Sequence, residues 1–263
     1  MCPSCGSLVG VRDDKCYSCG RANPGLWGFA PLLRQLGADL GFVPIVIGTS
    51  GTLYVLSLLL SGNELQPYAG GLNVLVPSRT ALLVLGMSGY VPVYVGKWWW
   101  TLLSASWLHG SLLHITFNMM WVRDLGPVMA EVVGPSRTVI IYTVAGFSGF
   151  LLSSTAHVPF TMGASASVFG LLGALVHYGR KSGSSLIRGQ ALNYALILFV
   201  MGFVMTGVDN YAHAGGFIGG YATSAFFNPL TRERGDHMLA AVLCLAATLL
   251  ALIFSALHGF GIV

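Results

Sequence analysis

Long apolar runs separated by short polar stretches make up most of the chain after residue 40. A helix that crosses a bilayer needs about 20 mostly apolar residues. The pattern predicts seven spans, at 43–60, 111–126, 138–155, 165–178, 191–207, 211–227 and 238–257. Two regions are ambiguous: 80–122 is almost uncharged but is broken by glycine and proline, and 158–178 carries small polar residues in its middle.

The composition agrees with a membrane protein. Of the 263 residues, 54% are hydrophobic and only 8% are charged, whereas a soluble domain carries about 25% charged residues. This excludes a soluble enzyme, a disordered chain and a protein that coats nucleic acid, so nucleic acid is not expected as a partner. The chain also has 35 glycines, which is typical of membrane helices that approach one another closely.

The positive charges indicate an orientation. With seven spans, Arg79 and Lys97 lie on one side of the bilayer and the other cationic residues lie on the opposite side. Positive charge concentrates on the cytosolic side of membrane proteins, so we expect a cytosolic N-terminus and an outside C-terminus. The residues expected on the cytosolic side are Arg12, Lys15, Arg21, Arg34, Arg123, Arg137, Arg180, Lys181, Arg188, Arg232 and Arg234.

Four of the five cysteines lie within the first nineteen residues, in two CxxC pairs that are each followed by glycine. Two such turns supply four thiolates, the tetrahedral ligand set that zinc prefers. We therefore expect a structural Zn²⁺ and a small zinc ribbon with the ligands Cys2, Cys5, Cys16 and Cys19. Disulfides or a redox pair remain the alternative reading. Free thiolates need a reducing compartment, which also favours a cytosolic N-terminus, where the ribbon could contact a cytosolic partner.

Polar residues recur within the apolar part of the chain, and polar residues in hydrocarbon indicate function. His114 and Asn118 are spaced i, i+4 and share a helix face. Ser165 lies in the small-residue turn Gly163–Ser167. His213 is followed by glycines at i, i+4 spacing, which would let its helix approach a neighbour and bring the imidazole within reach of Ser165.

Taken together and in order, these motifs resemble the rhomboid family of intramembrane serine proteases. The matching pieces are His109-Gly110, His114-Ile115-Thr116-Phe117-Asn118, Gly163-Ala164-Ser165-Ala166 and Val208-Asp209-Asn210-Tyr211-Ala212-His213-Ala214-Gly215-Gly216. The resemblance covers about residues 43–228 and implies an all-α polytopic membrane protein with a six-helix rhomboid-like bundle. The expected domains are a zinc ribbon (1–22), a linker (23–42), the six-helix core (43–230) and a seventh transmembrane helix (231–263).

The resemblance also implies roles for individual residues. Ser165 would be the nucleophile and His213 its general base and acid, in a dyad that needs no cofactor. Asn118, His114 and the backbone N–H of Ser165 would stabilise the oxyanion. We interpret Asp209 as a cap or packing residue rather than as a third catalytic member. The expected supporting residues are Gly163, Phe169, Gly216 and Gly220.

The implied function is a serine endopeptidase that hydrolyses transmembrane protein substrates near the outer face of a lipid bilayer, by resemblance a bacterial plasma membrane. The alternative is a catalytically inactive rhomboid-like protein that binds and escorts membrane helices. A transporter is a weaker alternative, because few charged pairs lie within the membrane. One departure from the family is Trp100, which stands where arginine is usual in the first outer loop.

Overall fold

The computed structural model describes residues 2, 4–10, 13–22, 24, 39–70, 73–205, 207–231 and 233–262. Most of the linker expected at 23–42 lies outside the described residues, as do Arg12, Arg34 and Arg232 of the charge pattern.

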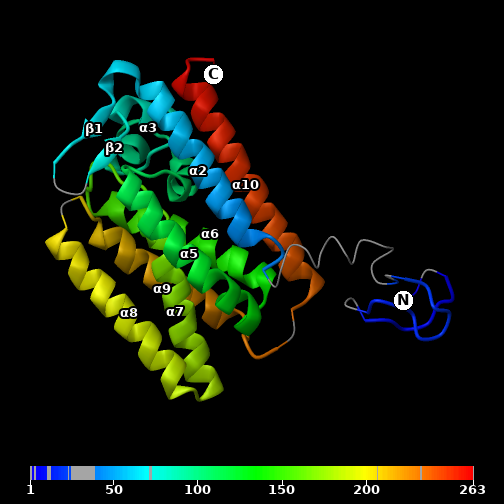
Figure 1. Ribbon diagram of the computed structural model, residues 1–263. Helices are drawn as coiled ribbons and strands as arrows, with labels where there is room; N and C mark the ends of the chain where they lie inside the picture. Colours follow the sequence, from blue (N-terminus) through cyan, green and yellow to red (C-terminus); the bar gives the residue numbers. More distant parts are fainter. Residues whose placement is uncertain are drawn as a thin grey trace.

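Within the described residues, seven long helices form the body of the molecule (Figure 1). Each overlaps one predicted span, although α5 ends later and α8 begins earlier than the hydropathy indicated. The prediction of an all-α polytopic membrane protein is confirmed. The helices are α2 (Phe42–Ser61), α5 (Leu112–Val132), α6 (Pro135–Thr155), α7 (Ser165–Ser182), α8 (Ser185–Val204), α9 (Asn210–Phe226) and α10 (Gly235–Gly259).

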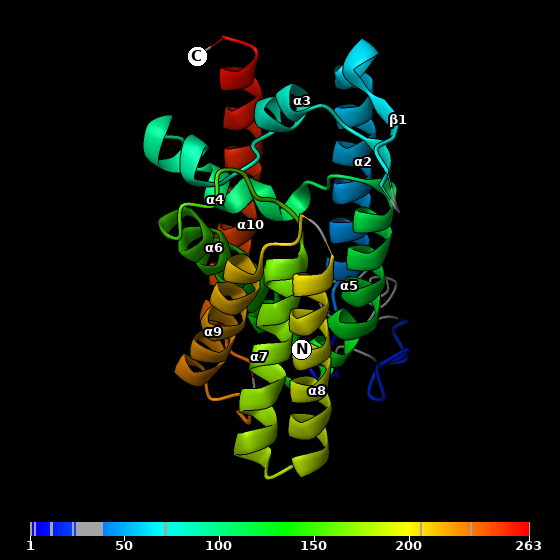
Figure 2. The same cartoon turned by 90° about the vertical axis from the view of Figure 1, so that its left-hand side faces the viewer.

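Helix α7 is less apolar than its neighbours, and other helices surround most of it. In the described part of the chain, four helices are long and apolar enough to cross a membrane: Phe42–Glu64, Pro135–Thr155, Ser185–Val204 and Gly235–Gly259. Helix α7 is buried continuously from Ala166 to His177, and Figure 2 shows it beside α8 and α9. A helix in this position can hold polar and small residues that a lipid-facing helix could not.

The ambiguous region before α5 is a loop with short helices rather than a span. A two-stranded hairpin comes first, with β1 (Gln66–Tyr68) antiparallel to β2 (Val74–Val76) after the short turn η2 (Gly62–Glu64). The elements that follow are α3 (Arg79–Val84), the π-helical turn η3 (Val91–Val95), α4 (Thr101–Ser104) and the 3₁₀ turn η4 (Ala105–Trp107). We call residues 79–107 the outer segment, after the outer loop that the rhomboid resemblance led us to expect in this region.

Glycines bring α9 close to α7. A Cβ at Gly216 would lie 2.0 Å from the carbonyl oxygen of Ala166, and one at Gly220 would lie 2.0 Å from that of Gly170. Any side chain at these two positions of α9 would collide with the backbone of α7. The close packing expected from the glycine spacing is therefore present.

A second pair of glycines faces α6. A Cβ at Gly219 would lie 1.9 Å from Oγ of Ser148, and a Cβ at Gly215 would lie 2.8 Å from the carbonyl oxygen of Ser148. Helix α9 therefore fits between two neighbours, which fixes its position along α7.

The seventh helix, α10, packs against the bundle and the outer segment. At its C-terminal end the ring of Phe254 lies 4.5 Å from that of Trp100 and is nearly perpendicular to it. His258 is similarly edge-on to Trp98, at 5.0 Å. Two of the tryptophans that precede α4 therefore contact protein.

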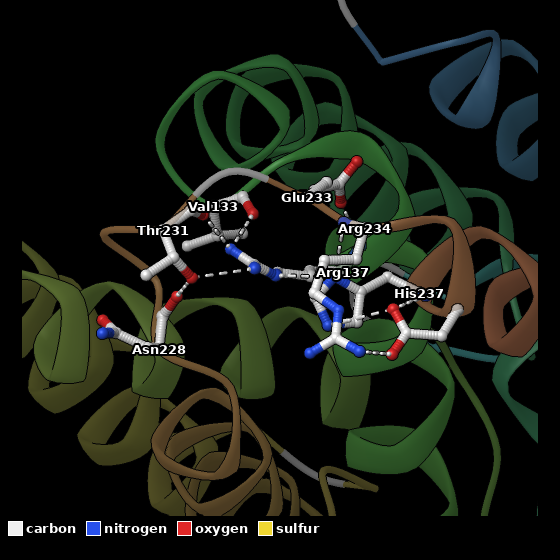
Figure 3. Close-up of polar contacts among 8 residues, drawn as sticks. Val133, Arg137, Asn228, Thr231, Glu233, Arg234 and His237 are labelled. Carbon is white, nitrogen blue, oxygen red and sulfur yellow. Dashed lines mark hydrogen bonds and ion pairs between the residues drawn. The ribbon is translucent and has the colours of Figure 1, made fainter.

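At the other end of α10, the buried Arg137 connects three segments (Figure 3). Its guanidinium donates to the carbonyl oxygen of Thr231 at 2.7 Å and to Nδ1 of His237 at 3.2 Å. Its backbone N–H donates to the carboxylate of Glu233 at 2.8 Å. The first turn of α6 is thus joined to the linker before α10 and to the first turn of α10.

Replacing Arg137 with alanine should lower the thermal stability of the detergent-solubilised protein. The change removes several buried hydrogen bonds and leaves their partners unsatisfied, at a cost of about 1–3 kcal/mol. Thermal unfolding followed by circular dichroism measures the effect. Arg123→Ala is the matched control, because that side chain is exposed on α5. Equal melting temperatures for the two variants would contradict the structural role given to Arg137.

Candidate active site

Ser165 is the first residue of α7, and its position depends on the loop before it. Gly163 has φ +121°, which L-residues with a side chain rarely adopt. Its N–H donates to the carbonyl oxygen of Ala105 in the outer segment at 2.9 Å. Two further backbone hydrogen bonds, of 3.1 and 2.8 Å, join Ser88 and Thr161. The outer segment therefore holds the turn that presents Ser165.

His213 lies in the first turn of α9 and meets Ser165 across the helix interface. Nε2 of the imidazole lies 3.0 Å from Oγ of Ser165. His213 is buried, whereas Ser165 keeps partial exposure. The structure thus brings together the two residues that the rhomboid resemblance pairs, although they lie 48 residues apart in the chain.

The ring of Phe169 fixes the plane of the imidazole. It lies one turn after Ser165 and stacks on His213, with a centroid distance of 4.2 Å and an interplanar angle of 15°. Stacking on one face leaves both ring nitrogens of His213 available at the edge.

Asp209 caps α9 and does not contact the imidazole through its carboxylate. Its Oδ1 accepts from the backbone N–H groups of Tyr211 and Ala212, at 3.0 and 3.1 Å. Its Oδ2 accepts a short hydrogen bond from the hydroxyl of Ser153 on α6. The interpretation of Asp209 as a cap is confirmed, and the same side chain ties the start of α9 to α6.

His114 borders the site from α5. A Cβ at Gly163 would lie 2.6 Å from Nε2 of His114 and 3.8 Å from Oγ of Ser165, so this ring edge and the hydroxyl flank the same glycine. Nδ1 of His114 accepts from the N–H of Gly110 at 3.2 Å. A neutral imidazole that accepts at Nδ1 carries its proton on Nε2, the atom of this ring nearest to the Cβ position of Gly163.

Asn118 and His109 lie near His114 but make different contacts. The amide nitrogen of Asn118 donates to the carbonyl oxygen of His114 at 2.8 Å, within α5. His109 is buried, with its ring 5.1 Å from that of His114. Two side chains were predicted for the oxyanion. The structure places His114 beside Gly163, two residues before Ser165, whereas the amide of Asn118 hydrogen-bonds within its own helix.

Asn210 was missed by the sequence analysis. Its Oδ1 lies 3.2 Å from Nδ1 of His213, on the side of the ring away from Ser165. The only sequence signal for this contact is the spacing of three residues in a helix. That spacing is common among polar residues, and it indicates a shared face rather than a hydrogen bond.

The four N-terminal cysteines form a separate cluster. Their Sγ atoms all lie within 4.8 Å of one another, an arrangement that could hold a metal ion. Sγ of Cys2 lies 3.7 Å from that of Cys19, and Sγ of Cys5 lies 3.6 Å from that of Cys16, both far longer than a disulfide. The two CxxC turns have the same backbone hydrogen bond. The N–H of Gly6 donates to the carbonyl oxygen of Cys2 at 2.9 Å, and the N–H of Gly20 donates to that of Cys16 at 2.8 Å.

One of these thiols is already biased toward the thiolate. The hydroxyl of Ser7 lies 3.4 Å from Sγ of Cys5. This hydroxyl, together with the backbone N–H of Ser7, lowers the pKa of Cys5 to about 6. A thiolate at neutral pH is the form that binds a metal.

Comparison with known proteins identifies the family. The model of the rhomboid domain matches residues 96–230, just over half of the 263 residues. The matched region runs from the outer segment to the end of α9, and it contains Ser165 and His213. The chain belongs to the rhomboid family.

Individual relatives of the chain are also rhomboid proteins. The chain is 32% identical over 152 residues to the rhomboid protease GluP of Bacillus subtilis. The aligned region makes up 56% of this chain and 30% of that protein. It is 34% identical over 153 residues to RHOMBOID-like protein 4 of Arabidopsis thaliana, covering 56% and 39%. RHOMBOID-like protein 7 of the same plant is 32% identical over 159 residues, covering 56% and 49%. The chain thus spans less than half the length of these relatives.

Asp209→Ala should lower the unfolding temperature, because it removes an N-cap that is typically worth about 1 kcal/mol. Asp209→Asn should stay close to the wild type, since an amide oxygen can accept the same backbone hydrogen bonds. Thermal unfolding of the two variants provides the measurement. Equal destabilisation by alanine and asparagine would show that the charge of Asp209, rather than its capping geometry, is what matters.

Proposed function

We propose that this protein is an intramembrane serine endopeptidase that uses Ser165 and His213 as a catalytic dyad. The observation that carries the proposal is the 3.0 Å distance between Oγ of Ser165 and Nε2 of His213, in a chain of the rhomboid family. A serine hydroxyl is a weak nucleophile unless an adjacent base takes its proton.

In the proposed reaction, Oγ attacks the scissile carbonyl carbon while its proton passes to Nε2 of His213. The carbonyl oxygen becomes an oxyanion and accepts hydrogen bonds from Nε2–H of His114 and from the free backbone N–H groups at the start of α7. His213 then returns the proton to the leaving amine, and water hydrolyses the acyl-enzyme by the same steps in reverse order.

The proposed substrates are transmembrane segments of other proteins. The charge pattern of the sequence favours an orientation in which the Ser165 end of the bundle faces the outside. A substrate helix hides its carbonyl groups in hydrogen bonds, so it must unwind locally before cleavage. Glycine or another poor helix former near the scissile bond lowers the cost of unwinding by about 1 kcal/mol per residue.

Ser165→Ala and His213→Ala should each abolish cleavage of a fluorogenic transmembrane substrate in detergent or liposomes, while far-UV circular dichroism stays unchanged. Removing a member of a serine nucleophile–base unit typically costs more than about 10⁴-fold in kcat.

The matched controls are Ser167→Ala and His177→Ala, two buried residues of α7 away from the Ser165–His213 contact, and both should retain cleavage. Activity that survives in both dyad variants would refute the assignment. A wild-type protein that binds the substrate but never cleaves it would favour the alternative of an inactive rhomboid-like protein.

We propose in addition that the cysteine cluster binds structural Zn²⁺. Four thiolates from two short turns suit its tetrahedral preference, and the ion would hold together a module too small for a hydrophobic core of its own. A metal at this site would have no part in peptide hydrolysis, because its ligands lie outside the helices that carry Ser165 and His213.

The purified protein should contain about one zinc per chain, as expected for a four-cysteine structural site. Cys16→Ser should lose it, whereas Cys244→Ser on α10 should keep it. Elemental analysis by mass spectrometry measures the content. Full zinc occupancy in Cys16→Ser, or a metal-free wild type that forms disulfides between these cysteines, would overturn the proposal.

A further inference from the structure

The second ring nitrogen of His213 has a partner that the dyad does not account for. Nδ1 lies 3.2 Å from Oδ1 of Asn210, and Nε2 lies 3.0 Å from Oγ of Ser165. A neutral imidazole carries a single proton, and an amide oxygen can only accept a hydrogen bond. The proton therefore belongs on Nδ1, which leaves the lone pair of Nε2 facing the serine hydroxyl.

This tautomer is the one that a general base requires. With the proton on Nε2 instead, the ring could not accept the proton of Ser165, and Nδ1 would face the lone pairs of the Asn210 amide oxygen. The contact with Asn210 thus selects the reactive form before any substrate arrives.

Two neighbours hold Asn210 in place. It is the first residue of α9, directly after the cap Asp209. On its other side lies Gly202 of α8, where a Cβ would come within 2.2 Å of Oδ1 of Asn210. The amide therefore occupies space that is free only because residue 202 is a glycine.

The imidazole is then fixed by two different contacts. The stacked ring of Phe169 fixes its plane, but a ring can still rotate within that plane or change its tautomer. The hydrogen bond to Asn210 restricts both of these freedoms. The two contacts together leave one orientation in which Nε2 faces Ser165.

We infer that Asn210 is a positioning residue for His213: its amide oxygen holds the proton on Nδ1 and keeps Nε2 available as the base. When the proton of Ser165 passes to Nε2, the ring becomes an imidazolium, and Oδ1 of Asn210 accepts a hydrogen bond from its Nδ1–H. The proton on Nε2 later passes to the leaving amine, and Nδ1 keeps its own proton throughout. This inference rests on the proposed function.

The first test measures the tautomer without relying on activity. In full-length Ser165→Ala protein labelled with ¹⁵N-histidine, the His213 signals are assigned by comparison with Ser165→Ala/His213→Ala. The ¹⁵N shifts should show a proton on Nδ1 and a bare Nε2. Adding Asn210→Ala should remove this preference, whereas adding Asn210→Asp should keep it. A proton on Nε2 in the parent protein would overturn the inference.

The second test measures cleavage with Ser165 present. Asn210→Ala should lower kcat by about 10- to 100-fold, the effect typical of losing a partner that orients a histidine, with KM nearly unchanged. Asn210→Asp should restore most of the rate, and Asn193→Ala, an exposed asparagine of α8, is the matched control. A wild-type kcat for Asn210→Ala would contradict the role.

The two tests separate the inference from the proposed function. If the wild type shows no cleavage but carries the proton on Nδ1, the proposed protease function is contradicted, and the contact between Asn210 and His213 has a structural role only. If cleavage depends on Ser165 and His213 but not on Asn210, the proposed protease function is supported and the positioning role of Asn210 is contradicted.

Discussion

The close approach of α9 to α7 is the constraint on which the rest of the site depends. Helices in lipid gain no hydrophobic stabilisation by meeting each other, so they associate by tight packing where side chains are small. Gly216 and Gly220 provide this, because a Cβ at either would lie 2.0 Å from a carbonyl oxygen of α7. Only at that separation can a histidine in the first turn of α9 reach a serine at the start of α7.

The outer segment supplies the other half of the arrangement. Ser165 begins its helix where it does because the preceding loop is bonded to Ser88 and Ala105. The outer segment is in turn packed against α10 through Trp98 and Trp100. The seventh helix, which lies outside the matched rhomboid domain, thus supports the loop that presents the serine.

The sequence predicted the long helices and the pair Ser165 and His213 because both leave local signals. Apolar runs indicate helices, and a polar residue in an apolar helix stands out. The short helices of the outer segment gave no such signal, since hydropathy cannot distinguish a loop folded against protein from a broken span.

Contacts between segments that lie far apart in the chain could not be predicted from the sequence either. Nothing in the spacing of Arg137 and Thr231 indicates that one donates a hydrogen bond to the other. Asn210 is a residue type common at the start of a helix, so the sequence does not indicate its contact with His213. Such contacts depend on how α6, α8, α9 and α10 are placed in three dimensions, which local patterns do not encode.

The most direct measurement of the central claim is the reaction of the full-length protein with a fluorophosphonate, followed by mass mapping of the adduct, in the wild type and in Gly220→Ala. We expect the wild type to be labelled on Ser165 and Gly220→Ala to lose labelling while staying helical, because alanine favours a helix but collides with Gly170. Gly189→Ala, where a Cβ meets nothing within 4 Å, should label normally. Labelling of Gly220→Ala at the wild-type rate, or an adduct on another residue, would contradict the account.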